Sequence, residues 1–494
     1  MSFNNFLRIS IFGSMCVSIF SRLSNEDICY TCDNEVLAFL FILHSVLYFA
    51  TYLKTPLSKI LTFILLVFFV SRLGILQLDL DFFAYPKFFP TVLQMREILL
   101  TLFLVSVSLL VGCFFGERIK LKKSQNYSLL WSSSIKDESL YYSYLTVVFI
   151  FSSLVLLYLT IVQTYSPTID HRLYEYSTLI IAKIARFFQF LGLLSIAWLI
   201  LRKPRGFQRK LTIFAIFLLL TSIILTGSKL ALISAILPFI FVYYASGLYI
   251  SRRKKRLFMA ILVLAILMFP VFTSLRTFYA AILVENQDYI NNVLTYHDPS
   301  RTVFKGWFIN TNIIQSIFGI AGRVGSSFDV LSFVLSSKDL FVPYANLMAE
   351  FVNIINGYYP GEIFKVDSPQ WAQRLPSLAG HGNYNTLLSI GVGENIGFIP
   401  HLIINFGIFW VCFWSFLTMF FYGISYNYFN MFIRITLLFS VFMGITNGSG
   451  FVAMVTQIPI FLLYLMILRM TFRIIRPFLQ KISTSKTIQY ETTS

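Results

Sequence analysis

Most of this chain consists of long apolar runs, each close to the length that crosses a lipid bilayer. A helix needs about 20 apolar residues to cross the hydrocarbon core, and a spanning segment must satisfy its backbone hydrogen bonds internally. Only 12% of the residues are charged, roughly half the share in soluble proteins. We therefore predict an all-α polytopic membrane protein of about 12 transmembrane helices. The predicted spans are 6–20, 36–53, 60–77, 97–115, 141–163, 178–201, 211–226, 230–250, 257–275, 397–422, 431–447 and 451–470.

The basic residues predict how these spans are oriented. Four basic clusters fall on one side if the spans alternate, and the positive-inside rule makes that side the cytoplasm, with both termini there. The clusters are 118–123, 202–210, 251–256 and 469–481. The segment 276–396 then faces outward, and it holds seven basic against nine acidic residues. The formal charge of +17 is therefore a topology signal, and we expect no nucleic-acid partner.

The same pattern predicts the organisation of the chain. Two apolar stretches in the outward segment, 307–337 and 340–359, predict helices that lie along or dip into the membrane interface. No internal repeat is visible, which counts against repeat-built transporter folds. The expected parts are an N-terminal membrane body of about nine helices at 1–275, a large outward loop at 276–396, C-terminal spans at 397–470 and a cytoplasmic tail at 471–494.

The cysteines and glycines carry no established cofactor motif. Cys29 and Cys32 form a lone CxxC pair, which is weak evidence for a redox or zinc site. Cys16, Cys113 and Cys412 lie in apolar runs and are expected to be packing residues. No His, Cys and Asp cluster has metal-ligand spacing, and no phosphate-binding or dinucleotide glycine loop occurs, so no cofactor or metal is predicted.

Cationic residues at the predicted outer surface are candidates for binding a diphosphate. Lys229 closes the turn "TGSK" between two spans, where backbone amides and an ammonium could seat a phosphate. Arg323, in "AGRVGSSFDV", could bind a diphosphate bidentately. The ordinary alternatives are a lysine that extends to lipid headgroups, and a local ion pair between Arg323 and Asp329. Further cations that could belong to the same site, or simply anchor helix ends or face solvent, are Arg276, Arg172 and Arg374.

His381 is the candidate for proton transfer. Glycines at 380 and 382 let the backbone approach a ligand, and histidine exchanges protons near neutral pH. The ordinary alternative is a structural histidine. Residues that could orient a hydroxyl, act as the base or pair with the histidine are Asn383, Asn385, Asp329, Glu350 and Glu394.

Two motifs together resemble those of the O-antigen polymerases (Wzy type) and O-antigen ligases. "TGSK" at 226–229 resembles their Gly-Ser-Arg turn, with Lys229 in place of arginine. "HGNYNTLLSIGVGENIGFIPHLI", from His381 to 403, resembles their segment in which His and Asn precede a short helix, glycines and a span. Here Gly382 separates His381 from Asn383. The resemblance covers about 205–425; the earlier spans match only in topology.

The resemblance implies an inner-membrane glycosyltransferase with a helical body similar to the GT-C class. Its substrate would be a glycan carried by undecaprenyl diphosphate, and membrane lipid, a chain-length regulator and a flippase would be its partners. Lys229 and Arg323 would stabilise the charge that develops on the leaving diphosphate. His381 or a nearby carboxylate would deprotonate the acceptor hydroxyl, with inversion at the anomeric carbon and without metal or nucleotide.

Three other functions remain open from the sequence. A ligase would transfer the glycan to lipid A core rather than to another repeat unit, and the polymerase is preferred because of the large N-terminal half and the outer loop. A flippase or transporter of lipid-linked oligosaccharide would place charges inside spans, where only Arg72 and Arg186 stand out. A non-catalytic scaffold would not require the two motifs to converge.

Overall fold

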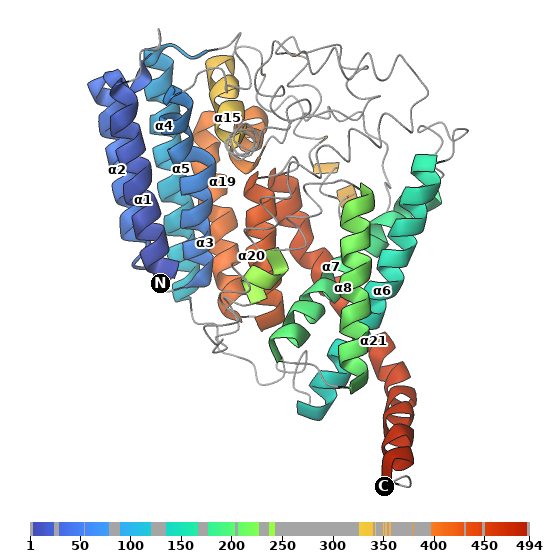
Figure 1. Ribbon diagram of the computed structural model, residues 1–494. Coiled ribbons are helices and arrows are strands. Elements are labelled where there is room, and N and C mark those ends of the chain that lie inside the picture. Colours follow the sequence, from blue (N-terminus) through green and yellow to red (C-terminus); the bar gives the residue numbers. More distant parts are fainter. Residues whose placement is uncertain are drawn as a thin grey trace. The chain divides into compact units, whose positions relative to one another are not determined.

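The computed structural model describes about three fifths of the chain, and every regular element in this part is a helix (Figure 1). Six of these helices are long and apolar enough to cross a membrane, which confirms the helical membrane class for the described ranges. Those ranges are 3–23, 29–53, 55–78, 89–119, 135–165, 176–202, 206–226, 237–242, 326–338, 341, 349, 351–352, 355–356, 378, 397–428, 431–446 and 450–491.

The predicted spans fall on helices wherever the structure describes them. Spans 230–250 and 257–275 lie outside the described residues except for 237–242, so the count of twelve and the outer loop stay predictions. The helices are α1 (Phe3–Phe20), α2 (Asn34–Ala50), α3 (Pro56–Leu65), α4 (Ser71–Leu78), α5 (Val92–Arg118), α6 (Ile135–Tyr165), α7 (Tyr176–Arg202), α8 (Gly206–Thr226), α15 (Ser326–Ser336), α19 (Phe398–Tyr428), α20 (Met431–Thr446) and α21 (Gly450–Glu491), with 3-10 turns η1 (Ser21–Leu23) and η2 (Tyr30–Cys32) and a π-helical turn η3 (Leu66–Val70).

The chain divides into two compact units, each built from several segments of the sequence. Unit 1 combines Met1–Lys122, Phe258–Gly357 and Phe364–Val455. Unit 2 combines Lys123–Leu257, Tyr358–Ile363 and Thr456–Ser494. Distant segments of the sequence therefore share one core in each unit.

Contacts between helix termini define two opposite ends of unit 1. At the first end, Arg8 near the start of α1 donates to Thr51 at 3.0 Å and lies over the Tyr52 ring after α2. At the other end, Ser21 after α1 donates to Thr31 at 3.1 Å, beside a disulfide between Cys29 and Cys32. We call the latter the disulfide end. It is the end at which α1 finishes and α2 begins.

Side-chain caps fix where α2 and α5 begin at the disulfide end. Asp33 accepts hydrogen bonds from the backbone N–H groups of Glu35 and Val36 and so caps α2. Thr91 and Gln94 form a reciprocal capping box at the start of α5. Arg96 on α5 then binds Asp33 at 2.5 Å, which ties the two helix starts together.

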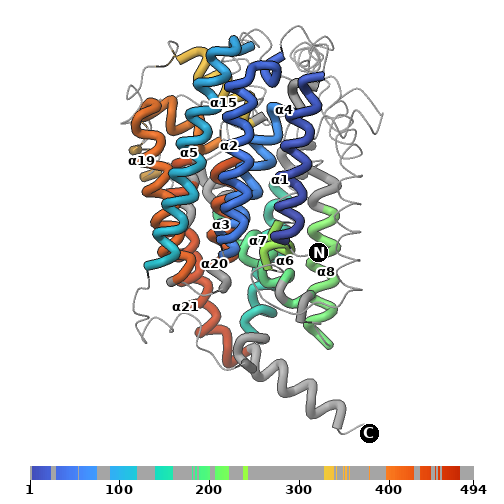
Figure 2. Tube along the Cα trace, turned by 90° about the vertical axis from the view of Figure 1, so that its left-hand side faces the viewer, coloured from blue at the N-terminus to red at the C-terminus, as the bar shows by residue number. Residues whose placement is uncertain are grey.

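Helices α5 and α19 approach each other closely, because glycines remove side chains from the interface. A Cβ at Gly112 would overlap the carbonyl oxygen of Phe416, and one at Gly116 would overlap that of Phe420. Gly423 of α19 in turn lies against Gly116. Both views show α5 and α19 side by side (Figures 1 and 2). Glycines four residues apart are the usual means by which membrane helices pack without a hydrophobic driving force.

Unit 2 is a bundle of α6, α7, α8 and the part of α21 from Thr456 onward. Polar side chains join its helices: Gln189 of α7 donates to Ser153 of α6 at 3.2 Å, and Gln208 of α8 donates to Ser143 at 2.9 Å. Aromatic contacts attach α21, with the rings of Tyr141 and Phe472 4.9 Å apart. Such hydrogen bonds and ring contacts replace the hydrophobic effect between helices in lipid.

Candidate functional site

Of the predicted site residues, Asp329 is the one that falls in the part of the chain that the structure describes. It lies in the first turn of α15. The convergence of the cations and His381 at one cavity therefore stays a prediction. The residues outside the described ranges are His381, Arg323, Lys229, Arg276, Arg172, Arg374, Glu350, Glu394, Asn383 and Asn385.

Asp329 forms a buried, bidentate ion pair with Arg72. Arg72 Nε donates to Asp329 Oδ1 at 3.2 Å and Nη2 donates to Oδ2 at 2.8 Å. Each side chain is only 1% exposed. The two residues are 257 positions apart. The pair therefore joins α4 of the N-terminal body to α15 within unit 1.

Local structure explains why an arginine is tolerated at this depth. Arg72 is the second residue of α4, directly after the π-helical turn η3, and such turns re-aim side chains and occur often at functional sites. Its neighbours Phe69 and Leu73 are fully buried, as are Phe328 and Val330 beside Asp329. Charged groups in such surroundings persist when they are paired and hydrogen-bonded.

The pair with Arg72 was not expected from the sequence, which offered Arg323 as a local partner of Asp329; Arg323 lies outside the described residues. Residues 327–335 are all buried. The described part of the stretch 307–337 is therefore covered by protein on every face. A carboxylate held by two guanidinium bonds is also poorly placed to accept a proton from a substrate.

Helix α15 lies at the disulfide end of unit 1, against the starts of α5 and α19 (Figure 1). Lys338, just after α15, is 3.9 Å from Glu97 of α5. Gly397 precedes α19 with φ +74°, and a Cβ there would be 2.8 Å from the carbonyl oxygen of Ile445 and 3.8 Å from Ser327 Oγ. The absence of a side chain at Gly397 therefore lets α15, α19 and α20 meet.

A second buried polar group follows on α19. Asn405 Nδ2 donates to the carbonyl oxygen of His401 at 3.1 Å and lies 3.3 Å from His401 Nε2. The two side chains are 1% and 4% exposed. Two residues later the helix is interrupted at Gly407, with φ 76° and ψ 169°. Breaks in spanning helices are tolerated where neighbouring protein groups satisfy the freed backbone groups.

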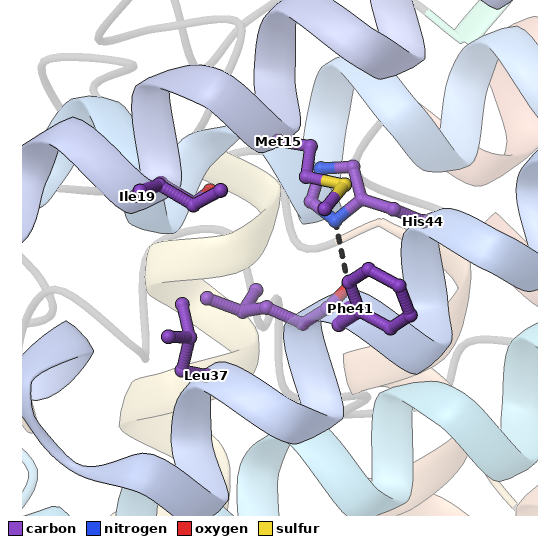
Figure 3. Close-up of a pocket in the computed structure, with 7 residues that line it drawn as sticks. Met15, Ile19, Leu37, Phe41 and His44 are labelled. Atoms are coloured by element: carbon purple, nitrogen blue, oxygen red, sulfur yellow. Dashed lines mark hydrogen bonds between the residues drawn. The ribbon is translucent and has the colours of Figure 1, made fainter.

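A cavity of about 80 Å³ lies between α1 and α2, and its lining is almost entirely apolar (Figure 3). His44 forms one wall of it. The backbone carbonyl oxygen of Leu40 can only accept a hydrogen bond, so His44 Nδ1 is the donor in their 2.6 Å contact. The other ring nitrogen, Nε2, then accepts from the Ser14 hydroxyl at 2.9 Å. Both ring nitrogens are thus engaged, and His44 is a structural histidine. The lining residues are Met15, Ser18, Ile19, Leu37, Leu40, Phe41 and His44.

In the sequence, Arg72 stands out only as an unusual charge inside a span, with no identifiable partner. The available signal was its position in an apolar run, since an intramembrane charge implies a partner. His401 and Asn405 were also missed, although their four-residue spacing places them on one helix face. Among the described residues, no group of three or more His, Cys, Asp and Glu side chains could hold a metal ion.

Comparison with known proteins adds no relative. No protein-family model, no curated protein and no solved structure matches this chain.

Proposed function

We propose that this protein is a glycosyltransferase of the bacterial inner membrane that polymerises lipid-linked oligosaccharide repeat units. The observation that carries the proposal is the joint occurrence of "TGSK" and "HGNYN", separated by one large predicted outer loop. The donor would be a glycan on undecaprenyl diphosphate, and the acceptor would be the sugar end of another repeat unit. Both termini would lie in the cytoplasm.

In this proposal, cationic side chains bind the diphosphate and a base activates the acceptor. Lys229 and Arg323, assisted by Arg276, Arg172 or Arg374, would stabilise the leaving group as the anomeric C–O bond breaks. Losing one such donor typically costs about 3–4 kcal/mol in the barrier. His381, Glu350 or Glu394 would take the proton from the acceptor hydroxyl, and Asn383 and Asn385 would orient it. The diphosphate is already an activated leaving group, so the reaction needs no nucleotide or metal.

Three features of the described residues support the proposal without testing its chemistry. Six helices suit a membrane body. The disulfide end of unit 1 is the end that the positive-inside rule predicts to face outward, and disulfides persist in oxidising compartments such as the periplasm. The first residue of α15, at that same end, comes three positions after Arg323.

The experiment replaces His381, Arg323 and Lys229 singly with alanine and compares surface polysaccharide on a gel at matched membrane protein levels. The proposal predicts a ladder collapsed to a single repeat on lipid A core. Bare core with polymer retained on its carrier would instead identify a ligase. Full-length ladders from all three variants would contradict the transferase.

Transport of lipid-linked oligosaccharide is the second candidate, and two observations favour it. The Arg72–Asp329 pair is buried inside unit 1, and α19 is interrupted at Gly407. Buried charges and discontinuous helices are frequent at transporter binding sites. A transporter predicts that the purified parent protein does not elongate glycan in detergent when donor is supplied, but moves lipid-linked oligosaccharide across vesicles.

A further inference from the structure

The disulfide between Cys29 and Cys32 lies in the short connection between α1 and α2. The bridged residues are three positions apart, and Cys32 is exposed whereas Cys29 is half-buried. Of the two bridged residues, Cys32 is thus the one more exposed to an incoming reagent. Within the described ranges, the pair belongs to no group of three or more His, Cys, Asp or Glu side chains that could hold zinc.

We propose that the Cys29–Cys32 pair is a thiol–disulfide exchange site, whose reaction partner is an external dithiol that attacks Cys32. A thiolate of the partner forms a bond to Cys32 Sγ, the Sγ–Sγ bond breaks, and the electron pair leaves on Cys29 Sγ. The second thiol of the partner then attacks the mixed disulfide and releases Cys32. The partner is oxidised to a disulfide, and the pair gains two electrons and two protons. This inference does not depend on the proposed glycosyl transfer.

The side chains around the bridge suit attack at Cys32. The Arg22 guanidinium is exposed and donates to the Cys32 carbonyl oxygen at 3.2 Å and to Asn34 Oδ1 at 3.3 Å. A cation held there attracts an incoming thiolate and stabilises a Cys32 thiolate once it forms. Thr31 Oγ1 lies 3.9 Å from Cys29 Sγ, within reach of the sulfur that leaves. Cys32 is thus the sulfur that is attacked, because it is exposed and lies beside a cation. Cys29 is the sulfur that leaves, beside the hydroxyl.

Residues of the bridged turn also contact the starts of α2 and α5. Tyr30 is fully buried, and its hydroxyl donates to the Pro90 carbonyl oxygen at 2.7 Å, just before α5. Asp33 follows the bridge directly, caps α2 and binds Arg96 of α5. Opening the bridge therefore acts on the turn that connects α2 to α5 at the disulfide end.

The test uses the full chain in native membranes, with Cys16, Cys113 and Cys412 replaced by alanine so that the pair holds the only cysteines. Dithiothreitol is the probe, and reduction is followed by the gel shift of a thiol-reactive polymer. We expect the native pair to be reduced at a rate within about a hundredfold of the rate in protein unfolded by detergent. A larger difference would show a sequestered structural bridge and overturn the proposal.

Single-cysteine variants test the order of attack. In Cys29→Ser the remaining Cys32 should react with an aromatic disulfide reagent at least about tenfold faster than Cys29 does in Cys32→Ser. Equal or reversed rates would overturn the assignment. Arg22→Gln should slow dithiothreitol reduction about threefold or more, whereas Arg118→Gln, at the opposite end of α5, is the matched control. If both arginine variants leave the rate unchanged, the role of Arg22 is wrong.

Discussion

Breaking the Arg72–Asp329 pair on one side should destabilise unit 1 far more than removing both charges together. Arg72→Met leaves Asp329 as a buried carboxylate without its guanidinium, and Asp329→Val leaves a buried guanidinium. Removing one partner of a buried pair typically costs about 3–5 kcal/mol, whereas replacing both with apolar side chains of similar volume is about neutral or stabilising. The double variant should therefore recover most of the stability that each single variant loses.

The assay is thermal unfolding of the purified protein in a nonionic detergent, read from the fraction that remains monodisperse. Both single variants should lower the midpoint by about 5 °C or more, and the double variant should return to within about 2 °C of the parent. The coupling between the two positions, which is the loss in the double variant minus the sum of the two single losses, is then about 6 kcal/mol or more in magnitude. We expect losses of this size because the Arg72 and Asp329 side chains are each only 1% exposed.

The Arg96–Asp33 pair is the matched control because it is partly exposed, at 31% and 19%. Arg96→Gln should shift the unfolding midpoint much less than either single variant of the buried pair does, because exposed ion pairs contribute little to stability. If the double variant at positions 72 and 329 loses as much stability as the two single variants added together, the charges are not coupled, and our account of the pair is wrong.

Three further predictions concern the packing and the pH response of unit 1. Gly116→Leu should force α5 away from α19 and cost about 1–3 kcal/mol or more, while Gly13→Leu, where a Cβ meets nothing within 4 Å, should not; equal midpoints would contradict the close packing. Gly407→Ala should cost about 1–3 kcal/mol, because φ 76° with ψ 169° is a conformation restricted to glycine, and a midpoint unchanged in detergent would argue against the break. The hydrogen bond from Arg96 holds the pKa of Asp33 below its ordinary value, so this contact stabilises above the unfolded pKa of about 3.9 and is lost as pH falls through the folded pKa. The midpoint difference between the parent and Asp33→Asn should therefore be constant from about pH 5 to 8 and vanish in stronger acid, and a difference that persists there would refute the assignment.

The helical class could be predicted from the sequence because the signal is local. The length and composition of an apolar run are enough to predict a spanning helix. The predicted spans up to residue 226 coincide with α1 to α8 within a few residues. Thr55 followed by Pro56, and the capping residues Asp33 and Thr91, are equally local signals of helix starts. The interruption of the third span by η3 was not predicted, since no proline or glycine marks it.

The partners of buried polar groups could not be predicted, because they depend on contacts between distant segments. Nothing near Arg72 in the sequence indicates a carboxylate 257 positions away. The sequence offered Arg323, six residues before Asp329, as one local partner, and nothing in it marks Arg72 as another. The close approach of α5 and α19 likewise needs both helices, although the spacing of Gly112 and Gly116 was visible.

The most direct test of the proposed transfer is a reaction with the purified full-length protein in detergent. The substrate is a single oligosaccharide repeat on undecaprenyl diphosphate, and the products are followed as polymer length and as released undecaprenyl diphosphate. The account predicts a ladder of lengths with one carrier released per added repeat, in the presence of a metal chelator, and loss of both products in His381→Ala. Polymer formation that is unaffected in His381→Ala, Arg323→Ala and Lys229→Ala, or no carrier release by the parent protein, would contradict it.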